Sequence, residues 1–198
     1  MKVTLPFDSG GRPLHKIHIG GVWAGKNPGV VRTVLGSCIA VCLRDPVARV
    51  GGMNHFMLPS GGSGEAVSAR YGVHAMEILI NDCMKHGANR KCLEAKVFGG
   101  GHVLRMRETD GNVPQSNISF ALHFLETEGI PIISRDLGGY AAREVYFFTD
   151  TGRILMKRLS ETGTNDDDMA TLEREERASF QPRKKAEVAP DDSNVTLF

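Results

Sequence analysis

Apolar and polar positions alternate in short runs along most of this chain. Between residues 17 and 157 the runs are separated by Gly, Pro, Asp and Asn, a pattern typical of β-strands joined by tight turns. Two stretches differ, because residues 73–84 and residues 118–125 repeat their apolar side chains at steps of three and four. That spacing puts the apolar side chains on one face, so each stretch predicts an amphipathic helix.

The ends of the two predicted helices carry recognisable signals. Gly87 follows the first helix and Gly129 follows the second, as expected for residues that stop a helix. The second helix has Ser116 and Asn117 as its candidate N-caps. After it, the run at residues 144–159 predicts a hairpin with turn residues in its middle, which closes the core.

These elements predict a single α+β domain. We expect an α/β sandwich of mixed, largely antiparallel sheets, with the two main helices packed on one side. The expected division is an N-terminal arm at residues 1–16, the domain at residues 17–159 and a tail at residues 160–198. The tail is polar and charged with almost no apolar periodicity, a composition that predicts disorder.

Composition and charge narrow the function classes. The 198 residues carry a formal net charge of +1, so we expect no nucleic-acid partner. No apolar run is long enough to span a bilayer, and Pro and Gly interrupt the N-terminus before a signal sequence could form, so we expect a cytoplasmic protein without membrane insertion. The four cysteines are too sparse for a disulfide scaffold and are interpreted as thiols.

A hairpin in the first half of the chain brings a cysteine and a histidine together. The runs "SCIAVCLRD" and "VGGMNHFMLP" read as strands, with a turn at Asp45–Ala48 between them. If Arg44 then pairs with Arg49, Cys38 stands opposite His55, unless a bulge shifts the register by one residue. Opposed side chains lie about 4.5–5.5 Å apart at Cβ, close enough to exchange a proton.

This pair predicts a nucleophile. A thiolate is the reactive form of cysteine, and a neighbouring imidazolium stabilises it. Gly36 and Ser37 form a bend just before Cys38, and the backbone N–H groups there could face an oxyanion. A lone cysteine on an apolar strand is more often structural, which is how we interpret Cys42.

A zinc site is the main competing interpretation. Cys38, Cys42 and His55 could converge on a metal ion, but the cysteine spacing falls within a strand, and no second ligand pair follows at zinc-site spacing. The sequence therefore predicts no metal. The glycines of "FGGGHV" lack the residues of a phosphate loop and are expected to let the backbone approach the site closely, with His102 at its rim.

The motif "TVLGSCIAVCLRDPVARVGGMNHFMLP" resembles the signature of the CheD family, the chemoreceptor glutamine deamidases. The likeness continues through "VFGGG" and "GGYAAREVYFFTDTGRILMKRL" and covers roughly residues 17–159. It implies a catalytic Cys, His and Thr, which match Cys38, His55 and Thr33. The family threonine would stand at Arg32, so Thr33 is one residue displaced, and in a strand such a change moves a side chain to the other face.

The resemblance also implies an activity and partners. The activity is hydrolysis of glutamine side-chain amides on the cytoplasmic helices of chemoreceptors, without cofactor, and Asn117 is carried over with Ser37 and Gly36 as a substrate or oxyanion group. A CheC-like phosphatase is a further implied partner. The alternatives are a non-catalytic chemotaxis adaptor that binds receptors or such a phosphatase, and a cysteine protease or transglutaminase that uses the same nucleophile.

Overall fold

The structure is a computed structural model that describes residues 8–58, 65–103, 112–159 and 174. The predicted tail thus lies outside the described residues, apart from Arg174. So do residues 1–7 of the predicted N-terminal arm.

Nine strands form two sheets in the described part of the chain. The four-stranded sheet has the order β1 (Leu14–Lys16), β3 (Val30–Leu35), β8 (Ala142–Phe148) and β9 (Ile154–Leu159). The five-stranded sheet has the order β2 (Val22–Gly25), β5 (Val50–Phe56), β4 (Ile39–Asp45), β6 (Glu94–Gly99) and β7 (Ile132–Leu137). The β1–β3 and β6–β7 pairs are parallel and the others are antiparallel. The strand pairing therefore starts before residue 17, the expected start of the domain.

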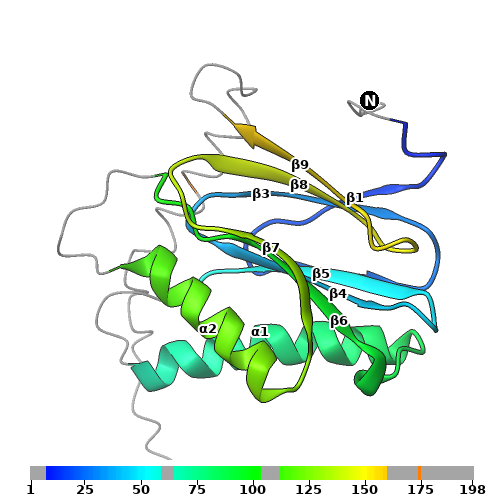
Figure 1. Ribbon diagram of the computed structural model, residues 1–198, viewed down its shortest axis with the longest axis horizontal. Helices are drawn as coiled ribbons and strands as arrows, with labels where there is room; N and C mark the ends of the chain where they lie inside the picture. Colours follow the sequence, from blue (N-terminus) through cyan, green and yellow to red (C-terminus); the bar gives the residue numbers. More distant parts are fainter. Residues whose placement is uncertain (1–7, 59–64, 104–111, 160–173, 175–198) are drawn as a thin grey trace, which may run out of the picture.

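The elements are arranged in three layers (Figure 1). The helices α1 (Glu65–Lys85) and α2 (Val113–Thr127) cover the outer face of the five-stranded sheet, and the four-stranded sheet packs on its other face. A short 3-10 turn, η1 (Arg90–Cys92), connects α1 to β6. The expected sandwich of mixed sheets with both helices on one side is confirmed.

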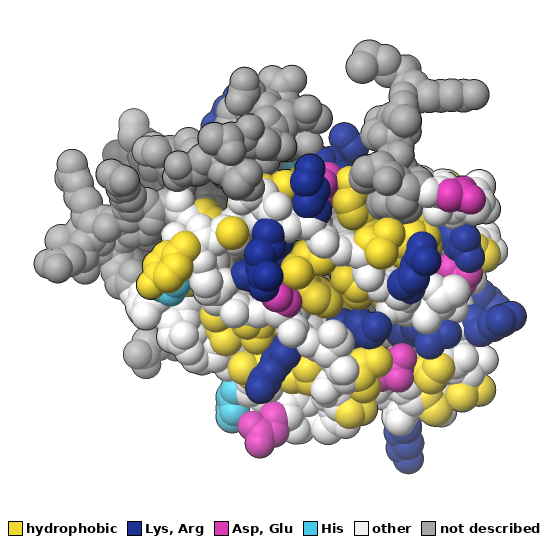
Figure 2. Space-filling view, turned by 45° about the horizontal axis from the view of Figure 1, so that its top comes forward, with side chains coloured by type: hydrophobic (Ala, Val, Ile, Leu, Met, Phe, Trp, Pro, Cys, Tyr) yellow, Lys and Arg dark blue, Asp and Glu magenta, His cyan; other side chains and the backbone are white. Residues whose placement is uncertain are grey.

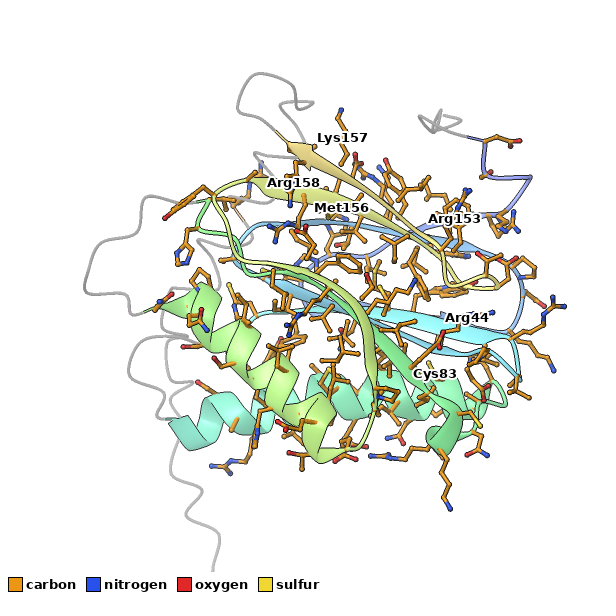
Figure 3. The ribbon with its side chains drawn as sticks, viewed as in Figure 1. Arg44, Cys83, Arg153, Met156, Lys157 and Arg158 are labelled. Atoms are coloured by element: carbon orange, nitrogen blue, oxygen red, sulfur yellow. The ribbon has the colours of Figure 1, made fainter. Side chains whose placement is uncertain are left out.

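Two apolar cores fill the spaces between the layers. One lies between the helices and the five-stranded sheet, and Cys83 of α1 belongs to it. The other lies between the two sheets and contains Cys38 and Cys42, with Met156 of β9 packed against it. Figure 3 shows Cys83 at the helix layer and Met156 between the sheets. The predicted reactive cysteine therefore lies in the core between the sheets.

The β4–β5 hairpin forms, but its predicted register is wrong. The observed pairs are Asp45 with Val50 and Ala40 with His55. Four residues, 46–49, therefore lie between the paired ends, whereas the predicted register pairs Asp45 with Ala48 and leaves two. Asp45 remains in the strand because its carboxylate accepts the N–H groups of Val47 and Ala48, and its carbonyl accepts the N–H of Arg49. Arg49 closes the loop in the left-handed region, with φ +59°.

The register error is two residues, so it leaves the faces unchanged. Cys38 and His55 are diagonal neighbours on one face instead of directly opposed residues. The pairing runs without interruption through Gly51 and Gly52, so no bulge shifts the register of this hairpin. The hairpin still places both side chains between the two sheets.

The second helix begins earlier than Ser116 or Asn117 suggested. Its N-cap is Asn112, whose side chain accepts the N–H of Gln115, and Pro114 lies in the first turn, where its missing N–H costs nothing. The helix ends near Gly129, as predicted. Asn117 is consequently an interior residue of α2 and points into the protein, where it is fully buried.

Basic side chains are spread over the face shown in Figure 2, with acidic and apolar side chains among them. Several basic residues of the protein have acidic neighbours. Arg158 on β9 contacts Asp136 on β7 at 2.7 Å, and Arg44 lies 3.5 Å from Glu94. These ion pairs reduce the local positive charge.

Candidate functional site

Thr33 of β3 and His55 of β5 meet across the space between the two sheets. The Thr33 Oγ1 lies 2.8 Å from His55 Nδ1, and it also donates to the carbonyl of Ile17 at 2.9 Å. A hydroxyl has one proton, so Thr33 must accept from Nδ1–H of the imidazole. The lone pair of a neutral His55 is therefore on Nε2. This buried atom has no hydrogen-bond partner among the described residues.

Burial determines the protonation state of His55. The side chain is almost completely enclosed, and desolvation, with a smaller contribution from His18, lowers the pKa of His55 to about 3. The imidazole is therefore neutral at pH 7. The preformed imidazolium that the sequence suggested beside the thiol is wrong for this arrangement. A neutral ring can instead act as a base.

Cys38 lies in the bend between β3 and β4, on the His55 face of the hairpin. Its carbonyl accepts the N–H of Gly100 at 2.7 Å, which fixes the backbone, and its Sγ lies 3.8 Å from Met57 Sδ. The residue has no exposed surface. The nucleophile candidate is therefore held in place and closed off from solvent.

The glycine segment that begins with Gly99, the last residue of β6, packs directly against this bend. Gly99 has φ +119°, and a Cβ at this position would stand 2.0 Å from the Cys38 carbonyl oxygen. Two residues later the N–H of Gly101 donates to the carbonyl of Gly36 at 2.7 Å. The expected close approach of the backbone is confirmed, and only a residue without a side chain fits at Gly99.

Asn117 joins three segments around the bend. Its Nδ2 donates to the Ser37 carbonyl at 2.9 Å, and its Oδ1 accepts the N–H of Leu58 at 2.8 Å. The Ser37 hydroxyl donates to Met57 Sδ at 3.5 Å. The amide of Asn117 thus ties α2 to the residues on either side of the site. This contact pattern suits a positioning residue better than a substrate ligand.

Arg32 and Thr33 occupy opposite faces of β3. Arg32 forms an ion pair with Glu144 on the neighbouring strand and lies over the Tyr146 ring. Thr33 faces the other way, toward His55. The one-residue offset from the family position therefore leaves the threonine, and not the arginine, on the side of the imidazole.

Two neighbours of the site were missed by the sequence reasoning. Met57 contacts Cys38, and a longer hairpin loop in the register calculation would have placed these two residues opposite each other. Arg143 of β8 is buried and donates to the Gly99 carbonyl at 2.6 Å, which supports the glycine segment. No local pattern in the sequence indicates that contact, because the two residues are distant along the chain.

In the described ranges no three His, Cys, Asp or Glu side chains are grouped so that they could hold a metal ion. None of the described helices is long and apolar enough to cross a membrane.

Comparison with known proteins assigns the family. Residues 57–158 match a family model described as CheD, chemotactic sensory transduction. A protein of Stenotrophomonas maltophilia named "Probable chemoreceptor glutamine deamidase CheD" is 47% identical over 166 residues, which are 84% of this chain and 79% of that protein. The chain belongs to the CheD family. A CheD protein of Thiobacillus denitrificans with the same name is 51% identical over 150 residues, 74% of each chain.

The CheD family match does not itself assign the site. The matched residues 57–158 begin after Thr33, Cys38 and His55 in the chain. The roles of these three residues in this CheD member therefore depend on the geometry described above.

Proposed function

We propose that this protein hydrolyses glutamine side-chain amides on bacterial chemoreceptors, with Cys38 as nucleophile and His55 as base. One observation carries the proposal. Thr33 holds the imidazole so that its unpaired, buried Nε2 lies on the sheet face that also carries Cys38. The names of the CheD relatives supply the substrate class.

In the proposed reaction the base removes the thiol proton as the sulfur attacks. His55 Nε2 takes the proton from Cys38, and Sγ bonds to the carboxamide carbon of the glutamine. His55 then gives the proton to the leaving ammonia, and a C–S thioester remains. Water, deprotonated by the same nitrogen, adds to the thioester. The C–S bond breaks, glutamate is released, and His55 returns the proton to the Cys38 sulfur. Throughout, the hydrogen bond to Thr33 keeps Nδ1 protonated and directs Nε2 toward the reaction.

Backbone groups of the bend stabilise the oxyanion in this proposal. The N–H groups around Ser37 and Cys38 face the developing negative charge, and the bend at Gly36 sets their direction. Asn117 contributes indirectly, because it holds the Ser37 carbonyl and thereby the orientation of the bend. No metal or organic cofactor takes part.

The buried thiol requires an opening step. Cys38 has no exposed surface and His55 only 1%, so a receptor glutamine reaches them only after neighbouring residues move. The structure therefore corresponds to a resting form in the proposed cycle. Receptor binding would supply the free energy for opening.

The decisive experiment incubates the protein with receptor cytoplasmic fragments and measures their mass. Conversion of each glutamine adds about one dalton through replacement of an amide by an acid. We expect this gain with the wild-type protein and with Cys42→Ala, and none with Cys38→Ala. If wild-type protein converts no glutamine in several receptors, the non-catalytic adaptor is the better account. Chain cleavage or cross-linking would instead indicate a protease or transglutaminase.

Thr33 is tested by a variant that keeps its shape. Thr33→Val removes the hydroxyl that accepts from His55 Nδ1–H, and we expect a loss of roughly 10- to 100-fold in kcat, since the ring loses its fixed tautomer. Thr149→Val is the matched control, because Thr149 is another buried threonine whose hydroxyl binds backbone, at Gly29. An equal loss in both variants would assign Thr33 a structural role only.

The proposal includes a location and a second partner. We place the enzyme in the cytoplasm, where the receptor helices that carry the glutamines are found. A CheC-like phosphatase is proposed as a binding partner on the strength of the family resemblance alone. A pull-down with purified phosphatase tests this, and it can fail without affecting the proposed deamidation.

A further inference from the structure

The side chain of Met57 is in contact with the proposed nucleophile, Cys38. Its Sδ lies 3.8 Å from Cys38 Sγ and 3.5 Å from Ser37 Oγ, and the residue is 4% exposed. The strand register explains this contact. Ile39 pairs with Phe56, so one further step along the hairpin places Cys38 opposite Met57. Met57 thus takes the position that the sequence assigned to His55.

The thiol and the imidazole are not joined in this arrangement. The Cys38 thiol donates to the Met57 thioether, while His55 Nε2 has no hydrogen-bond partner among the described residues. A thiol has a single hydrogen, so it cannot serve both acceptors at once. Reaction requires the thiol to turn from Met57 toward Nε2, its diagonal neighbour on the same face.

We propose that Met57 is a positioning residue that holds Cys38 in a resting orientation. The inference rests on the proposed function, since it treats Cys38 as the nucleophile. Met57 undergoes no covalent change. When the thiol turns away from it, the S–H bond of Cys38 breaks and the proton moves to Nε2 of His55, which leaves a thiolate beside an imidazolium. The thioether then keeps its hydrogen bond from the Ser37 hydroxyl and its packing contacts with the bend.

The proposal is tested by the alkylation rate of Cys38. Iodoacetamide reacts with the thiolate, and peptide mass spectrometry measures the modification of each cysteine separately. Met57→Leu keeps the volume but removes the sulfur that accepts from both Cys38 and Ser37. We expect Cys38 to react about 2- to 5-fold faster at pH 7, a factor that matches the loss of the weak hydrogen bond made by its own thiol. Met53→Leu is the matched control, because Met53 is a buried methionine of β5, the strand that Met57 directly follows, but it pairs with Cys42.

Two further measurements separate positioning from a loosened core. Cys42 is buried on β4, the strand that Cys38 directly precedes, so an increase in its labelling would show general opening and overturn the proposal. In a His55→Gln background the faster labelling should disappear, because the base that receives the proton is absent. Faster labelling that persists in that background, or no increase in Met57→Leu over Met53→Leu, also overturns it.

The alkylation result is independent of the proposed function. It needs no receptor, so a protein that converts no glutamine could still show the Met57 effect. Conversely, deamidation with an unchanged labelling rate in Met57→Leu would reject the role of Met57 alone. Where deamidation occurs, we expect Met57→Leu to leave KM unchanged and to raise kcat if the turning of the thiol limits the rate.

Discussion

At the scale of single residues, burial sets the chemistry of His55. Its pKa is lowered to about 3, whereas an unfolded histidine titrates near 6.5. Below pH 6.5 the unfolded chain binds a proton that the folded protein does not bind until about pH 3. This group's contribution to stability is therefore complete above pH 6.5 and is lost as the pH falls toward 3.

This argument predicts a specific acid sensitivity. Between pH 7 and pH 5 we expect the wild-type protein to lose about 2 kcal/mol of unfolding free energy through His55, and His55→Gln to lack this part of the slope. Urea denaturation at the two pH values measures it. The lowered pKa values of Asp45 and Asp150 act below this window, because the unfolded carboxyls titrate near 3.8. Equal slopes in both proteins would contradict the buried neutral imidazole.

The second residue-scale prediction concerns Cys42, which shares a strand face with Cys38. Burial raises the pKa of its thiol, so it stays protonated and unreactive. Cys42→Ala should leave deamidase activity intact and cost about 1 kcal/mol of stability through a small cavity. Activity assays and urea denaturation check both parts. A folded but inactive Cys42→Ala would mean that the nucleophile has been assigned to the wrong cysteine.

At the scale of elements, the sequence predicted on which face of a strand a side chain lies better than it predicted which residues pair between strands. Alternation in the two runs around Cys38 and His55 put both side chains on one face, because the period of a strand is two. The loop length decided the register, and it depended on the Asp45 carboxylate and on Arg49 in a left-handed conformation, neither of which the turn pattern indicates. The contact between Thr33 and His55 joins two sheets, so local patterns could not predict it.

The prediction at this scale concerns the glycine segment after β6. Gly99→Ala places a Cβ 2.0 Å from the Cys38 carbonyl, whereas Gly87→Ala meets nothing within 4 Å. Both glycines have positive φ, +119° and +99°, so the second variant controls for backbone strain. We expect Gly87→Ala to cost about 1 kcal/mol and Gly99→Ala at least about 2 kcal/mol more, with loss of deamidase activity. Similar unfolding free energies for the two variants would show that the bend tolerates displacement.

At the scale of the whole molecule, all the described strands pair within the two sheets, and both helices pack on one of them. The last described strand, β9, ends at Leu159 and lies beside β8 at one edge of the four-stranded sheet, and the site draws on both sheets and α2. The composition predicts the end of the domain after Leu159, since apolar periodicity stops there, and this boundary stays a prediction. The sandwich with both helices on one side was predicted from the helix-like and strand-like runs, whereas the division of the strands between two sheets depends on pairings distant along the chain.

The last prediction follows because all of these strands and helices lie before residue 160. A chain that ends at Ser160 keeps all nine described strands and both helices, so we expect it to fold and to deamidate receptor fragments at the wild-type rate. Thermal unfolding and the mass assay measure the two properties. The outer face of the four-stranded sheet is where a shortened chain is most at risk, because Val30, Tyr146 and Phe148 are all buried there and must stay covered. The Arg153 guanidinium lies 4.3 Å from the Phe148 ring centroid and shields part of this face. Aggregation of the shortened chain would show that residues after 160 are needed to cover the rest, and that the domain boundary lies further along the chain.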